Sequence, residues 1–334
     1  MRDKRIDILK GIGIILVVAG HCGSPFRNYI YTFHMPLFLF ISGYLRYRAK
    51  TKDWSTFIKG KIKTILIPYI LYWILSMIIF NNIVTIIKTG NLATIGINQI
   101  KGLLMGGKWL SYYSNNVALW YLLFFFICII VFEFLIRKFK YNTLAFIAGI
   151  CTAITLTVQQ KYAMPIFQLT VLPPALLFLF AGYLFSYLIN NHNSILETMN
   201  KKSVGITLIM FGLIIANRNN GDISNIKSNL YFISAIPSII GYFILSTTLS
   251  KFNIIEKLGK DSLYILGIHL LVTPYCKDIT TYISTATNIS NLLVLNTLTI
   301  ILILSVSMGI IELYRSAKKI IKEEFKTNEV LTVN

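Results

Sequence analysis

Long apolar stretches alternate with short polar segments along the whole chain. Ile12 to Ala19, Val117 to Phe132 and Leu292 to Ile310 contain few or no ionisable side chains. Since a helix needs about 20 apolar residues to cross a bilayer, stretches of that length predict membrane-spanning helices. The ten predicted spans are 8–26, 29–48, 62–83, 117–136, 141–159, 169–189, 203–219, 230–249, 261–280 and 290–312. The expected fold is an all-α, multi-pass membrane helix bundle.

Composition also favours a membrane protein over a water-soluble domain. Of the 334 residues, 55% are hydrophobic and only 13% are Asp, Glu, Lys or Arg. A soluble globular protein carries about a quarter of its residues as these charged types. We predict one transmembrane domain over residues 1–315 and a cytoplasmic tail over 316–334, with no appended soluble domain. The first span is expected to be retained, because no small-residue cleavage site precedes Cys22.

The distribution of basic residues predicts the orientation of the bundle. The chain has 32 Lys and Arg residues against 13 Asp and Glu, a formal net charge of +19. In the ten-span model, 23 basic residues fall on the side shared by both termini and eight on the other side, with Lys10 left inside the first span. Cytoplasmic loops carry the excess of Lys and Arg. Both termini are therefore predicted to be cytoplasmic.

Nucleic acid and metal ions are not expected as partners. The basic residues lie between apolar stretches and not along one solvated face, and no nucleic-acid-binding motif accompanies them. The four cysteines are scattered, with no C-x-x-C pair and no histidine cluster at zinc-binding spacing. The membrane lipids themselves are the expected surroundings of most of the chain.

Ionisable residues inside a span are costly and are functional candidates. The first span contains Asp7, Lys10 and His21. Eleven residues at 100° each return to within about 20° of the starting direction, so Lys10 and His21 share one helix face, about 16 Å apart along the axis. Asp7 lies one turn below Lys10 and is a candidate partner for it. This face is the first place at which we expect chemistry.

Two histidines are expected at a similar depth near the outer face. The first helix runs outward and ends near His21, and the second runs back and carries His34, after a short link. Imidazole is the commonest general base, so the pair suggests proton transfer, although one histidine near a helix end can also simply reach interfacial water. His269, about a third of the way across the ninth span from the cytoplasm, has two interpretations. It either makes an interhelical hydrogen bond or takes part in the function.

A basic segment precedes the third span. Its members are Arg46, Arg48, Lys50, Lys52, Lys59, Lys61 and Lys63. Topology and attraction to anionic lipid explain part of this pattern, and snorkelling explains the alternating Lys59, Lys61 and Lys63. The same three lysines are also placed to bind a phosphorylated cytoplasmic ligand.

Several segments resemble the acyltransferase family 3 membrane proteins, in particular the fucose 4-O-acetylase-like branch. The resemblance begins with RIDILKGIGIILVVAGH at 5–21 and FHMPLFLFISGY at 33–44. It continues through IPY at 67–69, LWYL at 119–122 and LGKDSLYI at 258–265, which leads to His269. The family pattern in the first helix is a basic residue, ten residues and then histidine. Lys10 stands where many members have Arg, and so lacks the bidentate guanidinium geometry.

The resemblance implies O-acylation, usually O-acetylation, of an envelope glycan or lipid-linked sugar by cytoplasmic acyl-CoA, here acetyl-CoA. His21 would be the general base and His34 its neighbour, with Lys10 and Asp7 completing the catalytic set. Donors to the tetrahedral oxygen are sought among Lys10, Tyr44 and Trp120. CoA phosphates would bind the basic segment at Lys59, Lys61, Lys63, Arg46 and Arg48. Substrate contact or support is expected from Ser42, Tyr44, Trp120, Tyr121 and His269.

Other interpretations remain open at this stage. A polysaccharide exporter or flippase of the same sequence type would translocate saccharide without acyl-CoA. A non-enzymatic scaffold is less favoured, because it gives no use to paired intramembrane histidines. Within the enzymatic interpretation, the acetyl group either reaches His21 on a threaded thioester arm or is relayed through an enzyme-bound intermediate.

Overall fold

The computed structural model describes residues 3–91, 96–106, 116–158, 169–192, 197, 201–217 and 221–332. Within these residues there is no β-strand, only an isolated bridge between Asp222 and Asn225. A helix occupies each of the ten predicted spans. Nine of these are α1 (Lys4–His21), α2 (Arg27–Arg48), α8 (Trp120–Lys138), α9 (Tyr141–Val158), α10 (Leu172–Asn191), α12 (Lys202–Ala216), α13 (Leu230–Thr248), α15 (Ser262–Thr287) and α16 (Leu292–Thr332).

The helix in the third span is interrupted twice. It consists of α3 (Trp54–Lys61), a π-helical turn (Ile62–Leu66), α4 (Ile67–Ile74), a second π-helical turn (Leu75–Asn81) and α5 (Asn82–Thr89). Pro68 follows the first π turn and has no N–H to donate to the carbonyl of Thr64, so the regular hydrogen-bond ladder changes there. Asp53 caps the start of α3 by accepting a hydrogen bond from the Thr56 N–H at 2.8 Å.

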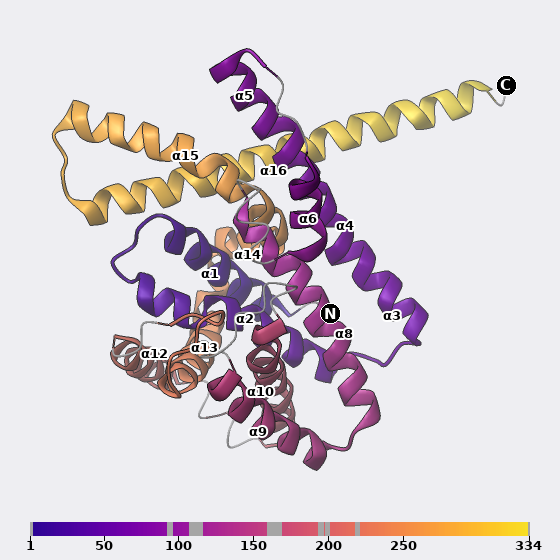
Figure 1. The fold of residues 1–334 in the computed structure, drawn as a ribbon, viewed down its shortest axis with the longest axis vertical. Coiled ribbons are helices and arrows are strands. Elements are labelled where there is room, and N and C mark those ends of the chain that lie inside the picture. Colours follow the sequence, from indigo (N-terminus) through magenta and orange to yellow (C-terminus); the bar gives the residue numbers. More distant parts are fainter. Residues whose placement is uncertain are drawn as a thin grey trace.

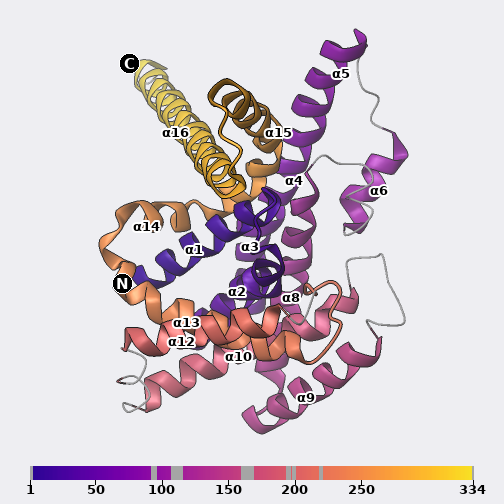
Figure 2. The ribbon, with the colours of Figure 1, turned by 90° about the vertical axis from the view of Figure 1, so that its left-hand side faces the viewer.

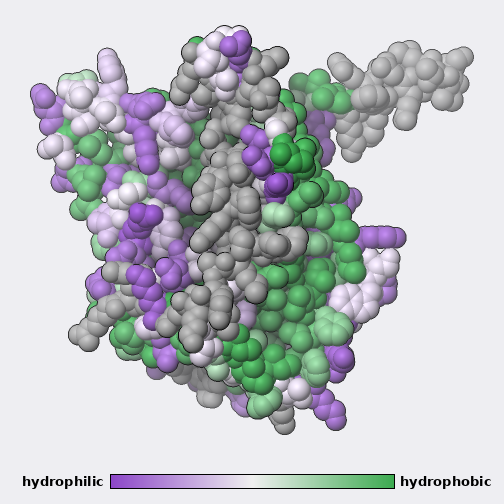
Figure 3. Space-filling model, in the orientation of Figure 1, coloured by the Kyte–Doolittle hydropathy of each residue, from purple (hydrophilic) through white to green (hydrophobic). Residues whose placement is uncertain are grey.

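Five helical segments in the described part of the chain are long and apolar enough to cross a membrane. They are Trp54–Ile78, Val117–Lys138, Leu169–Asn191, Leu230–Thr248 and Leu292–Ile321, and two shorter apolar helices span Thr143–Thr157 and Lys202–Ala216. The all-α membrane fold is therefore confirmed, whereas the count of ten crossings stays a prediction. Figure 3 shows a hydrophobic surface on the side of the molecule where α4 lies. Exposed apolar side chains of α4, such as Leu71 at 58% exposure, suit contact with lipid.

Helices α1 and α2 form the centre of the bundle (Figures 1 and 2). Helix α2 packs on α10 and α13, and α1 packs on α2, α13, α15, α16 and the short helix α14 (Asn253–Lys260). Glycines allow the closest crossings: a Cβ on Gly43 would collide with the Leu179 carbonyl, and one on Gly182 with the Phe40 carbonyl. Small residues at membrane helix contacts let backbones approach in this way.

One helix extends well beyond its predicted span, and a short helix lies between the third and fourth spans. Helix α16 does not end near residue 312 but continues to Thr332, through the segment predicted to be the cytoplasmic tail. The segment 84–116, in which Ile and Leu are mixed with Gly and Lys, predicts a partly interfacial loop or helix, and α6 (Ile97–Met105) is a short helix within it. Trp109, Tyr112 and Tyr113, also expected in this loop, lie outside the described residues.

The links between helices sort to two ends of the bundle. The α1–α2 link and the α15–α16 link lie together at one end, on the left of Figure 1, and the C-terminus lies toward the other. At the shared end, Lys277 Nζ donates to the His21 carbonyl at 3.2 Å, and Asn296 Nδ2 donates to the Gly23 carbonyl at 3.2 Å. This grouping agrees with the alternation of the predicted topology, in which both links are on the outer side.

Candidate active site

Three of the four histidines are connected by ring contacts within the bundle. The ring centroids of His21 and His269 are 5.4 Å apart. Tyr31 joins the third histidine to this pair, because its ring centroid lies 6.2 Å from His21 and 5.0 Å from His34. His34 and His269 are buried, and His21 is only partly accessible. The cluster thus combines one reachable imidazole with two enclosed ones.

Backbone carbonyls fix the tautomers of the two enclosed histidines. His34 Nδ1 lies 2.7 Å from the Ile30 carbonyl, and His269 Nδ1 lies 3.0 Å from the Leu266 carbonyl. A carbonyl oxygen can only accept, so each Nδ1 carries the hydrogen and each neutral ring keeps a lone pair on Nε2. Nε2 of His269 is buried and has no hydrogen-bond partner among the described residues. Its lone pair is therefore available to accept a hydrogen bond from the neighbouring His21.

The short helix α14 explains why His269 lies beside His21. Gly259 packs directly on the backbone of α1, where an added Cβ would collide with the Asp7 carbonyl, and Gly11 packs in the same way on Ile255. Helix α15 consequently begins beside the first half of α1, where Ser262 and Lys10 line the same cavity. The seven residues from Ser262 to His269 then rise by about 10 Å, which is enough to bring His269 close to the outer end of α1.

A cavity of about 300 Å³ lies beneath the histidines. Its wall includes Lys10 and Val17 of α1, Met35 of α2, Tyr121 of α8 and Leu266 of α15. Val17 is one turn before His21, Met35 follows His34, and the Leu266 carbonyl is bonded to His269. The cavity therefore extends along the Lys10 face of α1 to the edge of the histidine cluster. Tyr121 shapes this wall, because its hydroxyl donates to the Met35 carbonyl at 3.0 Å.

A second cavity, of about 370 Å³, opens at the basic end of α2 and α3. We call it the basic mouth, and its charged lining residues are Arg46, Lys50, Lys52, Lys61 and Glu133. Ser42, Leu45, Lys61, Thr64 and Ile129 line both cavities. The basic mouth and the cavity below the histidines are thus neighbours that share these wall residues.

One carboxylate organises the wall of the basic mouth. Glu133, 1% exposed, accepts hydrogen bonds from Arg46 Nε at 2.5 Å and from Arg137 Nε at 2.6 Å. The Arg137 guanidinium in turn stacks over the Trp54 ring, 4.4 Å from its centroid. The pairing with Arg137 lies within α8, and the one with Arg46 joins α8 to α2. Lys50, Lys52 and Lys61 supply further positive charge to the mouth.

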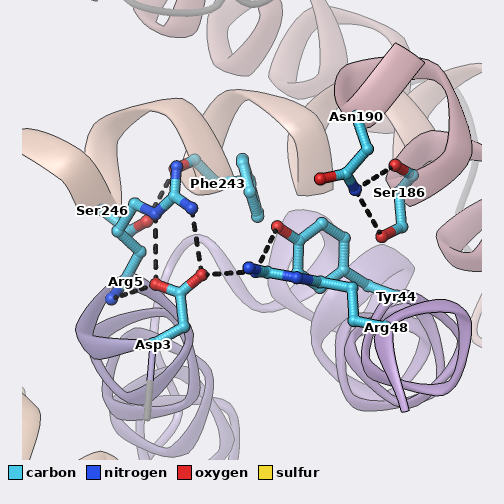
Figure 4. A network of polar contacts seen from close by, with 8 residues as sticks. All are labelled: Asp3, Arg5, Tyr44, Arg48, Ser186, Asn190, Phe243 and Ser246. Carbon is cyan, nitrogen blue, oxygen red and sulfur yellow. Dashed lines mark hydrogen bonds and ion pairs between the residues drawn. The ribbon is translucent and has the colours of Figure 1, made fainter. Parts of the chain in front are cut away.

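A second polar network joins the N-terminal end of α1 to the C-terminal end of α2 (Figure 4). Asp3 Oδ2 accepts hydrogen bonds from Arg5 Nη2 at 3.0 Å and Arg48 Nη1 at 2.9 Å, and Arg48 Nη1 also donates to the Tyr44 hydroxyl at 3.2 Å. Burial opposes ionisation of Asp3, but the hydrogen bonds and charge of both arginines outweigh it and hold the pKa of Asp3 below its usual value. We call Asp3, Arg5, Arg48 and Tyr44 the α1–α2 clamp.

Comparison with known proteins identifies the family. A model described as an acyltransferase domain, that of acyltransferase family 3, matches residues 3–311. The chain belongs to this family. It is also similar to two proteins named nodulation protein NolL: it is 49% identical over 57 residues to that of Sinorhizobium fredii, and 37% identical over 86 residues to that of Mesorhizobium japonicum. These matches cover 13% and 22% of this chain, and 16% and 23% of the relatives. No solved structure matches.

The acyltransferase family 3 match contains the histidine cluster and both cavities. Of the predicted catalytic residues, His21 and His34 contact Tyr31, and Lys10 faces the cavity that leads to them. Asp7 is buried, and its pairing with Lys10 stays a prediction. The fucose 4-O-acetylase-like branch also stays a prediction, because the family match does not separate branches.

The predicted ligand-binding residues divide into two groups. Ser42, Arg46, Lys61 and Tyr121 line the cavities. Arg48 and Tyr44 are held in the α1–α2 clamp, and Trp120 packs against Phe124. Lys59 and Lys63 are exposed on the α3 segment and line neither of the two cavities.

Sequence reasoning did not select Tyr31, Lys50 or Lys52 as site residues. The two lysines belong to the basic segment before the third span. The alternation of Lys59, Lys61 and Lys63 favoured those three lysines for CoA binding, so Lys50 and Lys52 were not selected. Tyr31 had a usable signal, because it lies three residues before His34 on the same helix face.

Proposed function

We propose that this acyltransferase family 3 protein is an O-acetyltransferase of the bacterial inner membrane. It moves an acetyl group from cytoplasmic acetyl-CoA to a hydroxyl of an envelope glycan or lipid-linked sugar. The observation that supports this best is the row of two adjacent cavities, which leads from the basic mouth and along the Lys10 face of α1 toward the histidine cluster. Such a path suits a donor with a polyanionic head and a long, narrow arm.

The basic mouth supplies the charge that such a donor needs. CoA carries phosphate groups at one end and its thioester at the other. Arg46, Lys50, Lys52 and Lys61 surround the mouth, and hydrogen bonds between cationic side chains and phosphate are among the strongest in proteins. Glu133 holds the Arg46 guanidinium in place from the side opposite the opening. In this proposal, the phosphates stay at the mouth.

The cavity beneath the histidines favours direct transfer over a covalent relay. Lys10 and His21 are about 16 Å apart along α1, and the cavity follows that face from Lys10 to Val17. Its lining is mostly apolar and aromatic, as suits an extended pantetheine arm. With the arm threaded into this cavity, the thioester carbonyl would lie below His21, within reach of a hydroxyl arriving from the outer side.

The histidines then provide proton transfer. The sugar hydroxyl attacks the thioester carbonyl while His21 takes its proton, and a tetrahedral oxyanion forms. Collapse breaks the carbon–sulfur bond and expels the CoA thiolate, which receives the proton from His21. The products are an O-acetyl ester and free CoA thiol. In this proposal, the lone pair on His269 Nε2, which has no partner in the part of the chain that the structure describes, accepts a hydrogen bond from His21 during the reaction and orients its ring, as the third member of a catalytic triad does.

Stabilisation by acetyl-CoA tests the donor site. A ligand at 100 times its Kd stabilises the folded state by about 2.7 kcal/mol, so saturating acetyl-CoA should raise the unfolding temperature of the purified protein. Lys61→Gln, which changes both cavities, should weaken this stabilisation, whereas Lys63→Gln on the same segment should not. Equal effects of the two variants would place the donor elsewhere.

Turnover of the His21→Ala variant tests the chemistry separately. Loss of a general base costs about 100- to 10,000-fold in rate. His21→Ala should therefore bind acetyl-CoA like the unchanged protein and lose transfer to envelope saccharide. Full turnover in this variant would remove the proposed mechanism. Translocation of saccharide without acetyl-CoA would favour an exporter.

A further inference from the structure

A third cavity, of about 300 Å³, opens at the opposite end of the bundle from the basic mouth. It lies between the α15–α16 hairpin and the end of α1, and Cys22, the residue after His21, forms part of its wall. Figure 3 shows polar residues on the surface over this hairpin. Its hydroxyl-bearing lining residues are Thr280, Thr281, Ser284, Thr285 and Thr299. We call it the outer pocket.

The outer pocket is tied directly to the histidine cluster. Lys277, one of its lining residues, donates from Nζ to the backbone carbonyl of His21 at 3.2 Å. Asn296 lines the other wall and holds the adjacent turn through the Gly23 carbonyl. A molecule in this pocket therefore lies beside the end of α1 that carries His21, on the side away from the donor cavity.

The hydrogen-bonding groups of the outer pocket are mostly acceptors. Thr281 donates its hydroxyl hydrogen to the Lys277 carbonyl at 2.9 Å, and Ser284 donates to the Ile289 carbonyl at 2.7 Å. Thr280, Thr285 and Thr299 likewise have oxygen partners. A hydroxyl that has used its hydrogen offers only lone pairs to a ligand. The pocket therefore suits a molecule rich in O–H donors, which is the chemistry of a saccharide.

Two cations give this end of the molecule a positive charge. Lys277 lines the pocket, and Arg27, whose guanidinium lies 5.0 Å from the centre of the Tyr31 ring, also acts electrostatically on His21. An ammonium group has three donors, and Lys277 spends one on the His21 carbonyl. Asp278, the next residue on α15, is exposed and does not line the pocket. The pocket thus combines acceptor oxygens with one directed positive charge.

We propose that the outer pocket is the acceptor subsite and that it takes an anionic saccharide, one whose phosphate or carboxylate pairs with Lys277. This rests on the proposed acetyltransferase function and adds the charge of its acceptor. The saccharide hydroxyls face the lone pairs of the threonine and serine side chains. The accepting hydroxyl then meets His21 from the outer side, opposite the thioester.

Protection of an engineered cysteine from alkylation tests the subsite without acetyl-CoA. The four native cysteines are buried, so Thr281→Cys introduces an accessible thiol in the outer pocket. In uncharged lipid nanodiscs, glucose 6-phosphate or glucuronate should slow its reaction with a maleimide at about tenfold lower concentration than glucose, because charge-assisted hydrogen bonds are the stronger ones. Thr287→Cys, on the same helix but outside the pocket, should show no protection.

Two controls test whether the pocket recognises an anionic saccharide: removal of the Lys277 charge, and inorganic phosphate in place of the sugar. In the Thr281→Cys protein, a second substitution, Lys277→Gln, should abolish the preference for the anionic sugars. Lys101→Gln, which removes the charge of an exposed lysine on α6, should leave that preference unchanged. Equal protection by glucose, no protection by either anionic sugar, or equal protection by inorganic phosphate alone would overturn the proposal. Acetyl-CoA stabilisation is measured independently at the basic mouth. If the anionic sugars do not protect the cysteine while acetyl-CoA still stabilises the protein, the acceptor subsite is rejected and the acetyltransferase function is not.

Discussion

Replacing Glu133 with glutamine should destabilise the protein and disturb the donor site together. Glu133 is 1% exposed, and its carboxylate receives Arg46 through Nε at 2.5 Å and Nη2 at 3.0 Å, as well as Arg137. The arginine side chains are only 18% and 19% exposed. Glutamine keeps the shape but removes the charge and turns an –NH2 group toward a guanidinium donor. Breaking a buried ion pair by removing one partner costs about 3–5 kcal/mol, and we expect a loss at the lower end because both arginines keep some water.

Thermal unfolding in detergent measures this loss, with Glu312→Gln as the matched control. Glu312 also joins two cations, Lys257 at 2.9 Å and Arg315 at 3.3 Å, but its side chain is 48% exposed. Ion pairs in water contribute little to stability, so the control should unfold like the unchanged protein. The Glu133→Gln variant should also lose part of its stabilisation by acetyl-CoA, because Arg46 is no longer held at the mouth. The reasoning is refuted if the two variants unfold alike.

Three further predictions concern packing, pH and catalysis. Gly259→Ala should cost about 1–3 kcal/mol in an unfolding experiment, because its Cβ meets a backbone carbonyl of α1; Gly149→Ala, in open space within α9, should stabilise by about 0.5–1 kcal/mol. The folded protein lowers the pKa of Asp3 below its usual 3.8, so the ionised carboxylate stabilises the fold above pH 3.8, and this stabilisation is lost as the pH falls through the lowered pKa. Asp3→Asn should therefore lower the unfolding temperature at pH 7 and approach the unchanged protein below pH 3.8, and a constant difference at all pH values would contradict this. His269→Gln should reduce turnover about 100-fold and shift its pH profile, with acetyl-CoA stabilisation unchanged; an unchanged pH profile would leave this histidine a packing role.

The helical periodicity of the first span predicted the central feature of the site. Lys10 and His21 were placed on one face by their eleven-residue spacing, and the structure places Lys10 on the wall of the cavity that rises toward His21. The hydrophobic pattern also located the helices, because the length of an apolar stretch decides where a chain can cross a membrane. The short α1–α2 link correctly predicted that these helices are neighbours.

Long-range contacts account for what the sequence did not reveal. The position of His269 beside His21 depends on α14 packing against α1 through Gly259 and Gly11, and no local pattern reports the depth at which α15 begins. Arg48 was assigned to CoA as one member of a basic segment, yet the structure pairs it with Asp3, 45 residues away. A run of like charges shows that cations are present, but only the fold shows which of them meet a carboxylate.

The central claim is that the acetyl donor enters from the basic mouth and that transfer takes place at the histidine cluster. It is tested most directly in proteoliposomes of known orientation, with acetyl-CoA supplied on one side and an envelope saccharide on the other. Acetyl-CoA on the side of the C-terminus should acetylate saccharide on the opposite side, and His21→Ala should abolish this transfer. Equal transfer with acetyl-CoA on the other side, or undiminished transfer in the variant, would contradict the account.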